Sequence, residues 1–163
     1  MTSPTVRRWA MLVAVGALVA PIALWATSQQ AGAQEAAQEQ ALPTLRLSKI
    51  QYDPPGDDVL TNTQINKEWV QIHNYGTKSR NLSGWVLRDV TGFRFKFPTG
   101  FVVAPGITVT IHTGKGTNKT QHLFWRQGAY IWNNTGDKAT LKNSAGKVVD
   151  TCAYSGAGQW VSC

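Results

Sequence analysis

Residues 68–89 read EWVQIHNYGTKSRNLSGWVLRD and contain two short runs in which the side chains alternate in character. The first run covers residues 69–74, the second covers residues 85–89, and a polar connection of ten residues separates them. An alternation with a period of two is typical of a β-strand that buries one face. The segment therefore predicts two strands joined by a tight polar connection.

Outside this segment, residues 44–163 show further short alternating runs and no stretch with a persuasive helical period. Glycine, proline and asparagine separate the runs, because these residues interrupt strand ladders and favour turns. The spacing predicts an all-β domain of about seven to nine strands, either a sandwich or a barrel. Six more segments are predicted as strands, namely residues 45–52, 93–97, 107–111, 130–133, 139–142 and 148–154.

Three more motifs follow residues 68–89 along the chain. They read FP and then VAPG within residues 97–106, WNNTGDKATL at residues 132–141, and GKVVD at residues 146–150. In this order and spacing the motifs resemble those of the lamin tail domain family, over roughly residues 44–154. The resemblance implies an immunoglobulin-like β-sandwich with no shared catalytic apparatus. Two features depart from the nuclear members, since residues 1–43 contain no coiled-coil rod and a predicted disulfide tail follows the domain. The chain therefore resembles an exported, bacterial-type member of the family, for which a filament role is not expected.

The first 33 residues have the layout of an export signal. A pair of arginines at positions 7–8 precedes an apolar run over residues 9–26, and Ala31-Gly32-Ala33 has the small-residue spacing of a cleavage site. We predict a signal peptide over residues 1–33 and secretion to the extracellular space or cell surface. An uncleaved membrane anchor is the alternative, because the apolar run is close to the about 20 residues that span a bilayer. The arginine pair also invites a twin-arginine interpretation, which the residues after it fit poorly.

Residues 34–43 are rich in Gln, Ala and Glu and contain no aromatic side chain. Such a segment cannot bury a core, so we predict a flexible spacer. The remaining residues 44–163 suffice for one compact domain with a C-terminal disulfide tail. Residues 43–163 contain 14 basic and seven acidic residues, which gives this part of the chain a net charge of +7.

Two cysteines, Cys152 and Cys163, lie in the last dozen residues. An even pair in an exported chain predicts a disulfide. The bond would clamp the last predicted strand to the C-terminus around the small-residue loop at residues 155–158. A metal site and a redox pair are the alternatives, and zinc is disfavoured because no histidine lies nearby in the sequence.

The three histidines, His73, His112 and His122, are expected to be solvated or half-buried. Nothing in the sequence brings them together with carboxylates, as a catalytic cluster would require. The nucleophile elbow, the metalloprotease helix motif and the phosphate-binding glycine loop do not occur in the sequence. We therefore predict that the protein is not an enzyme and has no cofactor.

One loop gathers three carboxylates, Asp53, Asp57 and Asp58. Clustered oxygens suit calcium, so this loop is a weak calcium candidate. The residues lack the alternate spacing of an EF-hand, and a solvated acidic turn is the simpler interpretation. No other metal site is predicted.

The basic residues suggest a different chemistry. Lys78 and Arg80 lie in one predicted loop, whereas Arg88, Arg94 and Lys96 lie on predicted strands. A domain with a net charge of +7 attracts polyanions. Nucleic acid and cell-wall polymers are the candidate ligands, and a generic solubilising surface is the alternative.

Tryptophans are numerous for a chain of this length. Trp85 and Trp132 are expected in the core. Trp125 and Trp160 lie in loop-rich segments, where exposed rings would stack on sugars or contact a protein partner. The alternative is that they cover the ends of the sandwich.

These observations predict a secreted, non-catalytic binding or interaction module, located outside the cell or at its surface. A polyanion-binding protein is the first alternative, and an enzyme is the least favoured one. The candidate partners are a cell-wall polymer, a glycan, a nucleic acid or another extracellular protein.

Overall fold

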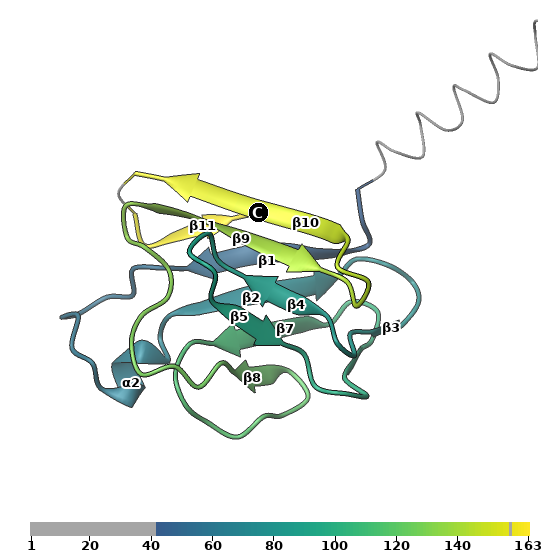
Figure 1. Ribbon diagram of the computed structural model, residues 1–163, viewed down its shortest axis with the longest axis horizontal. Helices are drawn as coiled ribbons and strands as arrows, with labels where there is room; N and C mark the ends of the chain where they lie inside the picture. The colour runs from purple at the N-terminus through teal and green to yellow at the C-terminus, as the bar shows by residue number, and fades with distance from the viewer. Residues whose placement is uncertain (1–41, 157) are drawn as a thin grey trace, which may run out of the picture. The chain divides into compact units, whose positions relative to one another are not determined.

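The computed structural model describes residues 42–156 and 158–163, and two stacked β-sheets form the framework of this part (Figure 1). The predicted signal peptide at residues 1–33 and most of the predicted spacer at residues 34–43 lie outside the described residues.

The larger sheet has five strands in the order β11-β1-β2-β7-β8. All neighbours are antiparallel except β7 and β8, which run parallel. The strands are β1 (Leu45–Gln51), β2 (Trp69–Asn74), β7 (Thr108–His112), β8 (His122–Phe124) and β11 (Trp160–Ser162).

The smaller sheet has four antiparallel strands in the order β10-β9-β4-β5. A separate two-stranded ladder is formed by β3 (Arg80–Asn81) and β6 (Val102–Val103). The strands of the smaller sheet are β4 (Val86–Arg88), β5 (Arg94–Lys96), β9 (Gly136–Lys142) and β10 (Val148–Ser155).

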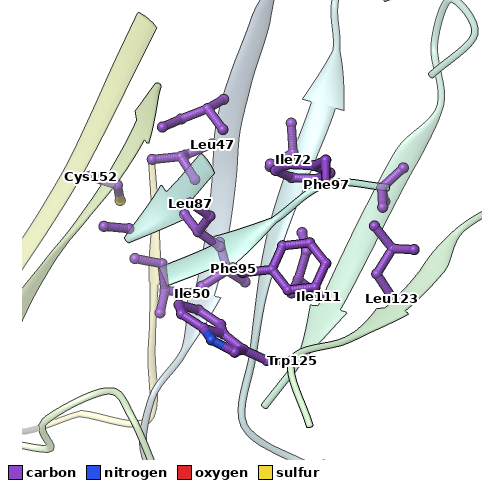
Figure 2. Packing of buried hydrophobic residues seen from close by; sticks show 14 of the residues in the cluster. Leu47, Ile50, Ile72, Leu87, Phe95, Phe97, Ile111, Leu123, Trp125 and Cys152 are labelled. Carbon is purple, nitrogen blue, oxygen red and sulfur yellow. The ribbon is translucent and has the colours of Figure 1, made fainter. Parts of the chain in front are cut away.

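One apolar core fills the space between the two sheets (Figure 2). Ile50 and Ile72 of the larger sheet and Leu87 and Leu141 of the smaller sheet each have 0% of their surface exposed. The period-two alternation explains this arrangement, because every second side chain of a strand points to the same face. Two sheets packed on one core make a sandwich, so the fold class predicted from the sequence is confirmed and the barrel alternative is wrong.

One predicted strand is wrong. Residues 130–133 do not form a strand in the structure. The backbone N–H groups of Ile131 and Trp132 instead donate to the carboxylate of Glu68, at 3.0 and 2.9 Å. A side chain therefore satisfies the backbone groups that a neighbouring strand would otherwise pair. Trp132 is buried in the core, as the sequence predicts.

Short elements account for the other differences from the predicted fold. The strands β3, β6, β8 and β11 contain two or three residues each, which is too few to show a period. The described residues therefore contain eleven strands, more than the seven to nine expected. The single-turn helix α2 (Asn62–Ile65) begins after Thr61, whose side chain accepts a hydrogen bond from the Gln64 N–H as an N-cap does.

Within the part of the chain that the structure describes, no helix is long and apolar enough to cross a membrane.

The C-terminal disulfide joins the two sheets. Cys152 lies on β10 of the smaller sheet, and its sulfur is bonded to Cys163, which directly follows β11 of the larger sheet. The Cys163 N–H also donates to the Ser48 carbonyl on β1, at 3.0 Å. The predicted pairing is thus present in the structure, and the bond does more than clamp a tail, because it closes one edge of the sandwich.

Candidate functional site

The outward side of the smaller sheet carries a cluster of cations. Along β9, the side chains of Ala139 and Leu141 enter the core, so the alternate residues of this strand point outward. The same alternation places cations outward on β4 and β5. We call this surface the basic face and define it by five residues, Arg88, Arg94, Lys96, Lys138 and Lys142.

Strand pairing sets the spacing of these cations. Arg88 on β4 is the direct partner of Arg94 on β5. Val86, two residues earlier on β4, pairs with Lys96 on one side and with Lys142 on the other. Because neighbouring strands lie about 4.8 Å apart, Arg88 and Arg94 occupy adjacent positions, whereas Lys96 and Lys142 lie on either side of Val86. Like charges directly opposite each other destabilise a sheet, so this arrangement has an electrostatic cost.

In the described residues, the nearby carboxylates are hydrogen-bonded to backbone and hydroxyl groups and not to the cations of the basic face. Asp89 accepts from the Gly92 N–H at 2.7 Å and from the Thr91 hydroxyl. Asp137 accepts from the backbone N–H of Val90, Asn133 and Lys138 at 2.7–3.3 Å. Asp150 accepts from the Leu47 N–H at 2.8 Å on the inward side of β10. These carboxylates support the turns and the sheet edge.

Two shallow hollows lie on the basic face. One, of about 250 Å³, is lined by Arg88, Arg94 and Lys142 together with the turn between β9 and β10. The other, of about 290 Å³, lies beside it over β9 and β10, and Arg88 and Lys142 line both. Asp89 also lines the second hollow, so of these two hollows only the first has basic residues and no carboxylate in its lining.

The structure brings together three of the five basic residues that the sequence singled out, Arg88, Arg94 and Lys96. Lys78 and Arg80 lie elsewhere, and one guanidinium nitrogen of Arg80 donates to the Thr44 hydroxyl at 2.6 Å. They lie apart from the basic face, because the loop and strand β3 that carry them do not belong to the smaller sheet.

Sequence reasoning missed Lys138 and Lys142, which complete the basic face. Their alternation with Ala139 and Leu141 marked them as outward residues of a strand. The missing information was that β9 pairs with β4, about 50 residues away in the chain.

Trp125 is not a contact residue. Only 7% of its surface is exposed, and its ring packs 5.9 Å from Phe95 and 6.0 Å from Trp132, measured between centroids. Figure 2 shows the ring lying in the core. The ring is not available for contact with a ligand, because Trp125 continues the alternation of β8 and faces the core as Leu123 does.

Trp160, the other candidate contact residue, is exposed. The ring has 51% of its surface accessible, and the Lys49 ammonium lies 3.8 Å from its centroid. A cation of the protein therefore already covers part of this ring.

The side chains of two of the three histidines lie at hydrogen-bond distance from each other. His112 Nε2 and His122 Nδ1 are 3.0 Å apart across the parallel pair β7 and β8, and His112 Nδ1 lies 2.9 Å from the Asn66 carbonyl. The Asn66 carbonyl can only accept a hydrogen bond, so the proton of the neutral His112 ring lies on Nδ1. Nε2 of His112 is then the acceptor in the contact with His122. Burial lowers the pKa of His112, and the neighbouring His122 lowers it further, against the opposing effect of the Asn66 hydrogen bond.

The weak calcium candidate is not supported. In residues 42–156 and 158–163, no group of three His, Cys, Asp or Glu side chains is placed to hold a metal ion. Asp53 accepts a hydrogen bond from the Asn134 amide at 3.1 Å, and Asp57 and Asp58 are exposed.

The fold and the face define a class of protein, an immunoglobulin-like β-sandwich that exposes a cationic sheet surface. Residues 38–156 match the sequence model of the Lamin Tail Domain family, and the chain belongs to this family. A stretch of 71 residues is also 32% identical to Lamin-C of Drosophila melanogaster; it covers 42% of this chain and 11% of Lamin-C. The chain thus matches only about a tenth of that relative. Membership in a family of non-enzymatic domains indicates a non-catalytic interaction module.

Proposed function

We propose that this protein is an exported interaction module that binds polyanions through its basic face. One observation carries the proposal: five cations from three strands converge on one open sheet surface, while the neighbouring carboxylates are engaged in hydrogen bonds. A surface of this kind raises the local concentration of anionic ligands and speeds their association.

The ligand class follows from the charge pattern. A repeating anion meets several cations at once, and each contact releases a counterion into solution. Nucleic acids and anionic cell-wall polymers both have this repeating charge. A neutral glycan or a protein partner would gain little from the basic face, so we rank these below polyanions.

Binding to a labelled oligothymidylate should weaken steeply as salt is added. If about five phosphates are engaged, a plot of log affinity against log salt concentration should have a slope of about −3.5, at about −0.7 per phosphate of a single strand. Fluorescence anisotropy at a series of KCl concentrations measures this slope. Salt-independent binding that disappears in Trp160→Ala would instead assign the interaction to the exposed tryptophan.

Reversing three charges on the basic face should abolish most of this binding. The variant combines Arg88→Glu, Arg94→Glu and Lys96→Glu. A matched control reverses three exposed lysines elsewhere, Lys67, Lys78 and Lys119, and has the same net charge. Equal losses in the two variants would show that net charge, and not the basic face, determines binding.

Export is part of the proposal and rests on residues 1–33 of the sequence. We expect cleavage after Ala33, so that the secreted protein begins at Gln34. N-terminal sequencing of protein recovered from the medium checks this. Recovery of the chain in the membrane with Met1 intact would favour the alternative, a membrane anchor.

A further inference from the structure

Resting on the proposed polyanion function, we infer that the 250 Å³ hollow is a binding site for a single phosphate group, and that the protein therefore selects phosphodiester polymers over carboxylate polymers. The first reason is the lining of the hollow. Its eight lining residues include two arginines and one lysine and no Asp or Glu. An anionic group that enters it meets hydrogen-bond donors and no opposing charge.

The two arginines form the core of the site. Arg88 and Arg94 are direct cross-strand partners, so their side chains leave the sheet from neighbouring positions. Nε of Arg88 is 3.4 Å from the Asp89 carbonyl, a long hydrogen bond that leaves both terminal nitrogens free for a ligand. A guanidinium offers paired donors that match phosphate oxygens, which a lysine ammonium does not.

The opposite wall comes from the turn between β9 and β10. Oδ1 of Asn143 accepts from the N–H groups of Ala145 and Lys147 at 3.1 and 3.0 Å, so its amide nitrogen remains as a donor. Ser144 lines the same wall. At Gly84 the backbone has a φ of 73°, and a Cβ there would lie 3.6 Å from the Ser144 Cβ, so the turn packs closely against the start of β4.

Size and direction favour a phosphate. Sites that enclose drug-sized ligands measure about 300–1,000 Å³, so a hollow of about 250 Å³ can hold a phosphate group together with a part of the polymer that carries it. The donors approach from β4, β5 and the β9–β10 turn, and therefore from several directions. The tetrahedral oxygens of a phosphate can accept from several directions at once, whereas the two oxygens of a carboxylate lie in one plane.

The two opposed arginines repel each other, and a phosphate-binding site gives a reason for this arrangement. Placing two guanidinium groups directly opposite each other is unfavourable in a sheet without a ligand. Departures from local rules of this kind are expected at functional positions. A phosphate bound between the two guanidinium groups would attract both of them and offset their repulsion.

The test uses the full chain and three probes of equal charge number: oligothymidylate, a glycerol-phosphate oligomer and oligogalacturonate. The variant Arg88→Lys with Arg94→Lys keeps the charge and removes the paired donors. We expect about a tenfold loss of affinity for both phosphodiester probes, because a tetrahedral phosphate can accept from both guanidinium groups at once. The loss for oligogalacturonate should be smaller, because a planar carboxylate pairs with one guanidinium at a time. The control, Arg80→Lys with Arg126→Lys, changes two exposed arginines off the basic face.

The outcomes separate the two claims. An equal loss for all three probes, or no loss for any, would overturn the phosphate site and leave the polyanion face in place. Failure of the wild-type chain to bind any of the three probes would overturn the proposed function itself. A loss confined to oligothymidylate supports the phosphate site and assigns its ligand to nucleic acid, whereas a loss for both phosphodiester probes supports it for phosphodiesters in general.

Discussion

Replacing Glu68 by Gln should flatten the pH dependence of folding stability between about pH 4.5 and 8. Glu68 is fully buried, with 0% of its surface exposed, and it accepts hydrogen bonds from the backbone of Ile131 and Trp132. Burial raises the pKa of its carboxyl from 4.5 to about 7, because desolvation outweighs these hydrogen bonds, and the nearby Asp137 raises it slightly further.

The sign of the effect follows from proton linkage. The folded state holds the Glu68 proton more tightly than the unfolded state, so this stability is fully present below pH 4.5 and is lost as the pH rises through about 7. A shift from 4.5 to about 7 corresponds to a loss of about 3 kcal/mol of folding free energy. His112 contributes in the opposite direction, because its lowered pKa adds stability that is lost as the pH falls below its ordinary value.

Urea unfolding at a series of pH values measures this effect. The difference between wild type and Glu68→Gln isolates the carboxyl, because the histidines titrate in both proteins. Asp57→Asn, which neutralises an exposed carboxylate, is the matched control and should follow the wild-type curve. If the stability of the wild type and that of Glu68→Gln change with pH in the same way, the raised pKa of the Glu68 carboxyl is contradicted.

Removing the disulfide should lower the folding free energy by about 3 kcal/mol. The bond closes a loop over a sequence separation of 11 residues and ties β10 to the residue after β11. Without it, the unfolded chain gains freedom, and β11 is held by its ladder with β1 and by the packing of Val161 against the core. Hydrogen exchange at residues 160–162 should therefore accelerate before the rest of the sandwich is affected.

The variant Cys152→Ala with Cys163→Ala tests this by urea unfolding, with Ser162→Ala as a control beside the bond. Alanine is suitable at position 152 because this side chain is buried in the core, where serine would add an unpaired hydroxyl. If the folding free energy changes by less than about 1 kcal/mol and hydrogen exchange in β11 is unaltered, the disulfide adds little stability to this edge of the sandwich.

The sequence predicted the sandwich because its evidence is local. The alternation in residues 69–74 is visible within one strand, and so is the burial of every second side chain there. The same local information placed Trp132 in the core and Arg94 and Lys96 on one strand face. It failed at residues 130–133, where the partner of the backbone is the carboxylate of Glu68, more than 60 residues away in the chain.

By itself, the sequence determined the fold class, the family, the pairing of the two cysteines and the excess of positive charge. Tertiary structure alone decided that Lys138 and Lys142 join Arg88 and Arg94, that Trp125 is buried, and that the disulfide links two sheets. The physical reason is that a strand's period reports which side chains share a face, whereas the neighbours of that face depend on strand order and register. Those are set by contacts between distant parts of the chain.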